Sequence, residues 1–213
     1  DRYRQIVRAL RTRGIEPLVT LHHFTNPAWL AALGGWSSEA VVPLFDRYVR
    51  KVVAALGDEV DFWCTINEPN VYLFCTYLEP IFPPGTASLR RAYSAAGQLV
   101  RAHAAAYRAI HEIQPHARVG LPVNVRIFDA ANPSSRIDRA LAGYHHRLFN
   151  ELFLLAAHDG RLRLPGRAES IPGAARTMDF VGVNYYTRDL VALSPSPSRR
   201  FLRRFPSPGS PVG

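Results

Sequence analysis

Residues 60–69 read VDFWCTINEP, an apolar run of strand length that ends in Asn67, Glu68 and Pro69. The bulky and β-branched side chains of residues 60–66 favour a buried strand. A proline disfavours helical backbone in the residue before it, so Pro69 predicts an extended conformation for Glu68. We therefore expect a carboxylate directly at the end of a buried strand.

Three further apolar runs of strand length alternate with long amphipathic segments. The runs cover residues 17–21, 118–123 and 179–183, and helical periodicity marks residues 1–13, 38–57, 88–113 and 134–157. Candidate N-caps are Ser38, Ser88, and Ser134 or Ser135, and Gly57 is a candidate helix end. Short strands separated by long helices indicate parallel strands joined by helical crossovers.

The fold class follows from this alternation and from a missing motif. Neither GxGxxG nor GxxxxGK[ST] follows any of the runs, which argues against a doubly wound nucleotide-binding fold. The remaining architecture is an α/β fold, a partial (β/α)8 TIM barrel with about four strand–helix units, since a complete barrel takes about 250 residues. We place the partial barrel at residues 1–193 and a Ser/Pro/Arg-rich loop or disordered end at residues 194–213.

Composition excludes several classes of protein. The 213 residues are 47% hydrophobic and 20% charged, which is typical of a soluble globular chain rather than a disordered one. No apolar run approaches the roughly 18–20 residues of a membrane span, and no targeting segment is visible, so we expect no membrane partner. The net charge of +9 comes from arginines spread along the chain, so nucleic-acid binding is not expected. Two cysteines fit a reducing cytoplasm and no disulfide framework.

Polar and aromatic residues gather where the predicted strands end. Chemistry in a parallel barrel lies at the carboxyl ends of the strands, so these residues are candidates for a polar pocket with aromatic walls. Glu68 can serve there as a general acid near neutral pH, because desolvation favours a protonated carboxyl. Asn67 can donate to and accept from a sugar hydroxyl. On spacing alone, a loop glutamate in a salt bridge remains an alternative for Glu68.

The motif TINEP at 65–69 looks like the acid/base motif of glycoside hydrolase family 1, the retaining β-glucosidase family. Other segments resemble the family in the same order, and the likeness covers residues 1–190. They are GIEPLVTLHHFTNPAWL at 14–30, GGW at 34–36, YLEPIFPPG at 77–85, AHAAAYRAI at 102–110 and DFVGVNYYT at 179–187. The resemblance implies a β-glucoside or oligosaccharide as substrate, a retaining double-displacement mechanism, and no metal or organic cofactor.

The resemblance also implies roles for single residues at matching positions. Glu68 resembles the general acid/base, Asn67 the residue that binds the sugar 2-hydroxyl, and His23 the residue that binds the glycone. Tyr186 resembles the tyrosine that hydrogen-bonds the nucleophile, and Asn184 and Asn124 resemble supporting polar residues. Three further residues are expected to support the site or the core: His22 behind the site, Trp36 as a structural residue and His103 as a core histidine.

The nucleophile of the family is missing from the sequence. Retaining glycosidases need two carboxylates about 5–5.5 Å apart. The Thr-Glu-Asn-Gly motif that carries the second one does not occur here, and the last acidic residue is Asp189. The chain resembles barrel strands three to six, so we expect a fragment that is inactive alone. The alternatives are a truncated barrel that binds carbohydrate or assembles with another chain, and another sugar-cleaving barrel of the same clan. The oligomeric state is left open.

Overall fold

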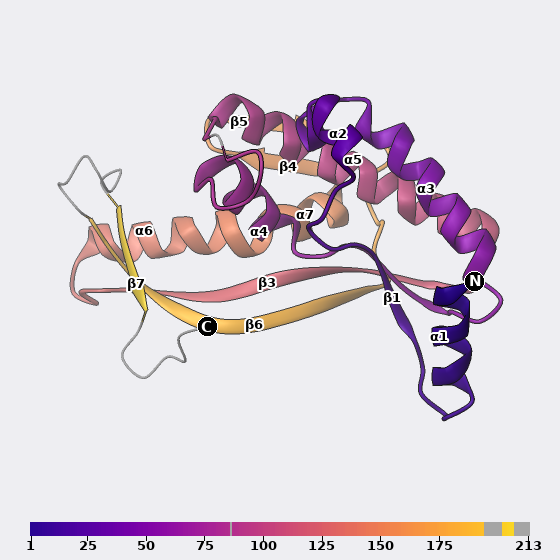
Figure 1. Ribbon diagram of the computed structural model, residues 1–213. Coiled ribbons are helices and arrows are strands. Elements are labelled where there is room, and N and C mark those ends of the chain that lie inside the picture. Colours follow the sequence, from indigo (N-terminus) through magenta and orange to yellow (C-terminus); the bar gives the residue numbers. More distant parts are fainter. Residues whose placement is uncertain (86, 194–201, 207–213) are drawn as a thin grey trace. The chain divides into compact units, whose positions relative to one another are not determined.

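The structure, a computed structural model, describes residues 1–85, 87–193 and 202–206. It divides into two compact units: Asp1–Val123 with Phe153–Gly182, and Asn124–Leu152 with Val183–Gly213. The helices and strands follow one another in the order α1 (Arg2–Arg11), β1 (Leu18–His22), α2 (Ala28–Ala32), η1 (Gly35–Ser37), α3 (Val41–Leu56), β2 (Phe62–Ile66), α4 (Pro69–Leu73), η2 (Phe74–Leu78), α5 (Leu89–Ile113), β3 (Arg118–Ala130), α6 (Arg136–His146), η3 (Arg147–Glu151), α7 (Leu152–Asp159), β4 (Arg161–Leu164), β5 (Arg167–Ser170), β6 (Phe180–Leu193) and β7 (Leu202–Pro206) (Figure 1).

The first unit holds a parallel sheet that alternates with helices, as predicted. Leu18 of β1 lies opposite Phe62 of β2, and Phe62 lies opposite Arg118 of β3. The start of β6 follows β3 in the sheet. A Cβ atom at Gly120 of β3 would come within 2.3 Å of the Phe180 ring, so glycine allows this aromatic side chain to lie against the strand.

The two long helices of the first unit, α3 and α5, pack against each other (Figure 1). Helix α5 begins where predicted, because the Ser88 side chain accepts a hydrogen bond from the Arg91 amide (3.3 Å). Helix α3 ends at Gly57 as predicted. Ser38 is not its N-cap. That position is Ala40, and the Ser38 hydroxyl accepts instead from the Ala40 amide (3.3 Å).

A buried tryptophan connects β2 to the end of α5. Trp63 is fully buried, and its indole N–H donates to Oε1 of Gln114 (3.1 Å). The side-chain nitrogen Nε2 of Gln114 in turn donates to the backbone carbonyl of Val60 (2.8 Å). The polar atom of this large apolar side chain is therefore satisfied inside the core.

Several elements differ from the prediction. The segment predicted as one helix over 134–157 is α6, a π-helical turn (η3) and α7. The antiparallel hairpin of β4 and β5 was not predicted. Its alternation places Leu162 and Leu164 inside, and the turn between the strands contains Gly166 at φ +69°.

The second unit contains the later parts of β3 and β6, which extend well beyond the predicted strands. Arg188 of β6 donates to the Asp129 carboxylate of β3 (2.6 and 2.9 Å). Residues 202–206, expected in a loop or disordered end, form β7, which pairs antiparallel with β6. Residues 194–201 and 207–213 lie outside the described residues. Among the described helices, none combines the length and apolar character needed to cross a membrane.

Candidate active site

The ends of β1 and β2 place three of the predicted site residues together. The Asn67 amide donates to the carbonyl of His22 (2.8 Å), which holds the two strand ends side by side. The Asn67 side-chain nitrogen lies 3.4 Å from Nε2 of His23. Glu68 follows directly and is buried, with 5% of its surface exposed. His23, Asn67 and Glu68 therefore form one cluster in the first unit.

The backbone of Glu68 is left-handed (φ 44°, ψ 60°) and not extended, so that prediction is wrong. Two hydrogen bonds explain the difference. The Glu68 amide donates to the carbonyl of Pro122 on β3 (2.8 Å), and the Glu68 carbonyl accepts from the Tyr72 amide (3.0 Å). Glu68 thus begins α4 with Pro69 as its first residue, a position that proline favours. Such strained backbone in a non-glycine residue is typical of functional sites.

A second strained residue lies beside His23. Phe24 has φ +66°, and the Thr25 amide donates to the His23 carbonyl (2.8 Å), so residues 23–25 form a tight γ-turn. The Phe24 ring lies 5.0 Å from the His23 ring and 5.4 Å from that of Phe82. These contacts place aromatic rings next to His23, and the expected polar pocket with aromatic walls stays a prediction.

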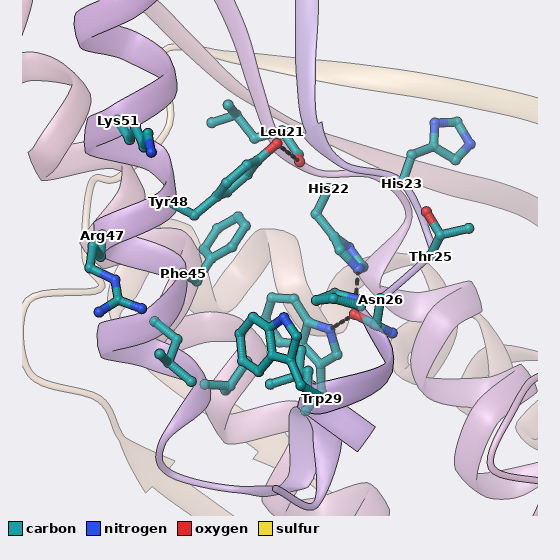
Figure 2. Close-up of a pocket in the computed structure, with 15 residues that line it drawn as sticks. Leu21, His22, His23, Thr25, Asn26, Trp29, Phe45, Arg47, Tyr48 and Lys51 are labelled. Atoms are coloured by element: carbon teal, nitrogen blue, oxygen red, sulfur yellow. Dashed lines mark hydrogen bonds between the residues drawn. The ribbon is translucent and has the colours of Figure 1, made fainter. Parts of the chain in front are cut away.

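His22 and His23 point to opposite sides, as successive strand residues do (Figure 2). His22 is 7% exposed, and burial lowers its pKa to about 4, so its imidazole is neutral at pH 7. Its Nε2 lies 3.2 Å from Oδ1 of Asn26, which also accepts from the indole of the buried Trp36 (2.8 Å). The expected structural role of Trp36 agrees with these contacts, and the place of His22 behind the site stays a prediction.

A pocket of about 630 Å³ opens on the His22 side of β1 (Figure 2). Its walls include the half-exposed Trp29, together with Tyr48 of α3, whose hydroxyl donates to the Leu21 carbonyl (3.0 Å). The lining includes His23 but neither Asn67 nor Glu68. The pocket therefore meets the predicted site only at His23.

The other predicted site residues belong to the second unit. Asn124 on β3 is buried, Asn184 on β6 is half-buried, and Tyr186 on β6 is exposed. Their places around Glu68 stay predictions. In the part of the chain that the structure describes, no group of three or more His, Cys, Asp or Glu side chains could hold a metal ion.

Two residues near this cluster, Asn26 and Tyr72, had no predicted role. Asn26 bonds to His22 and Trp36, and its amide nitrogen donates to the hydroxyl of Tyr72 (2.9 Å). Tyr72 lies four residues after Glu68 in α4 and is buried. The spacing of four residues between Glu68 and Tyr72 could have identified Tyr72 as a neighbour of the site, since residues i and i+4 share a helix face.

His103 is the core histidine that its apolar helical stripe predicts. It is 2% exposed, and Thr65 Oγ1 lies 2.7 Å from its Nδ1. Burial lowers its pKa to about 4 from the ordinary 6.5. The charged imidazole is therefore disfavoured in the folded state.

We expect the free energy of unfolding to fall as the pH drops from 7 to 4. In the unfolded chain His103 becomes protonated below about pH 6.5, whereas in the folded chain it becomes protonated only near pH 4. That difference corresponds to about 3 kcal/mol. Urea unfolding of the purified protein at several pH values measures it. His103→Gln should weaken the dependence, which the buried His22 with its own pKa of about 4 partly preserves, and the exposed His116→Gln should leave it unchanged; equal curves for the two variants would contradict the prediction.

Comparison with known proteins assigns the chain to a family. The model of "Glycosyl hydrolase family 1" matches residues 1–204. A "Beta-galactosidase" of Pyrococcus woesei is 33% identical, over 89% of this chain and 42% of the relative's length. A "Cytosolic beta-glucosidase" of Cavia porcellus is 35% identical, over 67% of this chain and 31% of the relative's length.

Solved structures agree. A "beta-glycosidase from Pyrococcus horikoshii" is 38% identical with a TM-score of 0.86, covering 95% of this chain and 46% of that one. A "Beta-glucosidase from Thermotoga maritima in complex with deoxynojirimycin" is 29% identical with a TM-score of 0.85, covering 95% and 48%.

These likenesses confirm the predicted partial (β/α)8 barrel, and the chain spans about half the length of the relatives that it matches. Since the family match extends over nearly the whole sequence and includes the Asn67–Glu68 pair after β2, the chain belongs to glycosyl hydrolase family 1.

Proposed function

We propose that this chain carries the acid/base part of the active site of a retaining β-glycosidase, with Glu68 as the general acid and base. The observation that supports this most directly is the burial of Glu68 at the end of β2, next to Asn67 and in one cluster with His23. A carboxyl group sheltered from bulk water beside groups that can bind hydroxyls suits proton transfer to a glycosidic oxygen.

The reaction would run in two steps. In the first, the Glu68 carboxyl gives its proton to the glycosidic oxygen. The bond from that oxygen to the anomeric carbon breaks, while a second carboxylate bonds to that carbon. In the second, the Glu68 carboxylate takes a proton from water. The water oxygen bonds to the anomeric carbon and the second carboxylate leaves, which releases the sugar and restores both groups. The second carboxylate is not identified in this sequence, which lacks the Thr-Glu-Asn-Gly motif.

The substrate that we propose is a β-glucoside or a related oligosaccharide. His23 and Asn67 would bind hydroxyls of the glycone, and Asn124, Asn184 and Tyr186 would complete the polar surroundings of the carboxylates. The relatives named β-glucosidase and β-galactosidase support this substrate class. The relatives named cytosolic β-glucosidase support a place in the cytoplasm. Carboxylate chemistry of this kind needs no metal or organic cofactor.

The 213-residue chain alone is expected to show no turnover, because double displacement needs the second carboxylate. The test follows release of 4-nitrophenol from its β-glucoside by this chain, by its Glu68→Gln variant and by the protein as its gene encodes it. We expect only the last to hydrolyse the substrate. Release by the 213-residue chain that disappears in Glu68→Gln would contradict this prediction.

The alternative is a non-catalytic barrel that binds carbohydrate or assembles with another chain. It draws support from β1, which stands at one edge of the described sheet, where unpaired backbone groups can accept another strand. Calorimetry with glucoimidazole, an inhibitor bound in a related Thermotoga maritima structure, separates the two proposals. Binding by the gene-encoded protein without any hydrolysis of aryl β-glycosides would favour the alternative.

A further inference from the structure

Asn26 contacts three separate elements of the first unit. Its Oδ1 accepts from the Trp36 indole (2.8 Å) in η1 and lies 3.2 Å from Nε2 of His22 at the end of β1 (Figure 2). Its Nδ2 donates to the Tyr72 hydroxyl (2.9 Å) in α4, and to the Phe24 carbonyl at 3.4 Å. One short side chain thus joins the β1 end, η1 and α4, together with the γ-turn at Phe24.

The chemistry of the partners fixes the orientation of this amide. An indole nitrogen can only donate, so the atom of Asn26 that faces Trp36 must be the oxygen. His22 is neutral at pH 7 and faces the same oxygen, so it carries its proton on Nε2. The amide nitrogen is then left for Tyr72 and Phe24. If the Asn26 amide were rotated by 180°, its NH₂ group would face the indole N–H of Trp36, and neither group could accept the hydrogen bond.

The contacts of Asn26 extend to the turn that begins at His23 and to the helix that begins at Glu68. On one side, Phe24 is the centre of the γ-turn that begins at His23. On the other, the Tyr72 amide donates to the carbonyl of Glu68, which has the strained left-handed backbone. The rings of Trp36 and Tyr72 also pack on His22, at 4.8 and 5.5 Å between centroids.

We propose that Asn26 is a positioning residue that couples the turn of His23 to the helix that begins at Glu68. The proposal rests on the proposed function, since it assigns Asn26 a part in placing the general acid against the glycone. Asn26 is itself exposed, whereas His22, Trp36 and Tyr72 are buried. Loss of its side chain therefore leaves the buried apolar contacts in place and removes the hydrogen bonds that set the geometry.

The experiment compares Asn26→Ala, Tyr72→Phe and the double variant in the protein as its gene encodes it. Thr25→Ala is the matched control, because it lies in the same turn and its side chain makes no hydrogen bond in the described part of the chain. We expect Asn26→Ala to lower kcat/KM for an aryl β-glucoside by between about tenfold and a hundredfold. The loss should be mainly in kcat, because small displacements of catalytic groups strongly lower the rate of the chemical step. Thr25→Ala should stay within about twofold.

The double variant tests the coupling itself. If Asn26 acts through Tyr72, the loss in the double variant should be smaller than the product of the two single losses. Multiplicative losses would overturn the coupling, and an Asn26→Ala variant as active as Thr25→Ala would overturn the positioning role. If the unchanged protein hydrolyses no β-glycoside, the proposed function fails first and this inference fails with it.

Nitrogen NMR of His22 gives a readout that does not depend on activity. The unchanged protein should show the Nε2–H tautomer, and Asn26→Asp should raise the pKa of His22 by placing a carboxylate beside it. Asn26→Asp keeps an acceptor for Trp36, and the Tyr72 hydroxyl can turn to donate to the new carboxylate, so only the N–H bond to the Phe24 carbonyl is lost. It should therefore keep the tautomer of the neutral His22 and retain more kcat than Asn26→Ala. An Asn26→Asp variant as impaired as Asn26→Ala would overturn the role assigned to the Tyr72 contact.

Discussion

Glu68→Gln is expected to lower kcat/KM by about 10²–10⁴ for β-glucosides with poor leaving groups, in the protein as its gene encodes it. Gln keeps the size of the side chain but cannot give a proton to the glycosidic oxygen. Substrates whose aglycone leaves as a stable anion need little protonation, so formation of the glycosyl-enzyme from them should be much less affected. The measurement is kcat/KM over a series of aryl β-glucosides with leaving groups of rising pKa.

A matched control distinguishes this role from a general loss of charge. Glu112 lies on α5 and pairs with Arg50 at an exposed position, so Glu112→Gln should leave kcat/KM unchanged within about twofold. A loss in Glu68→Gln that is equal for good and poor leaving groups would contradict the acid role. In that case Glu68 would contribute to binding or to structure. The alternative that Glu68 is a loop glutamate in a salt bridge would then be favoured.

Trp63→Ala is expected to lower the free energy of unfolding by about 3–5 kcal/mol. The indole is fully buried in the core of the first unit, and its removal leaves a cavity that the packed sheet and α5 can fill only in part. It also removes the donor to Gln114 Oε1. Urea unfolding followed by circular dichroism measures the change.

The same substitution at Trp29 is the control. Trp29 is 53% exposed, so Trp29→Ala should change the free energy of unfolding by less than about 1 kcal/mol. Trp63→Phe, which keeps an aromatic ring but loses the N–H, should lie between the two. Similar losses in the free energy of unfolding for Trp63→Ala and Trp29→Ala would contradict the close packing around β2.

The sequence by itself determined the elements whose signals are local. Helix α5 begins at Ser88 because a serine hydroxyl can accept from the amide three residues on, and α3 ends at Gly57. The strands at 17–21 and 60–66 were predicted to within two residues, because buried strands consist of mostly apolar runs. The positions of His23, Asn67 and Glu68 directly after those strands followed from the same runs.

Features that depend on distant partners were decided only by the tertiary structure. The later halves of β3 and β6 mix polar and apolar residues, and their pairing with neighbouring strands makes them strands. Residues 202–206 form β7 for the same reason. The alternation in residues 161–164 was a local signal for β4 that the prediction did not use.

The site shows the same division. The sequence placed Glu68 after a strand, and the family resemblance assigned it a role. Its left-handed backbone depends on the carbonyl of Pro122, more than fifty residues away in the chain. The bonds of Asn26 to Trp36 and Tyr72 likewise join residues that only the fold brings together. Sequence patterns report local conformation and burial, whereas the hydrogen bonds that orient a catalytic group come from whichever residues the folded sheet sets beside it.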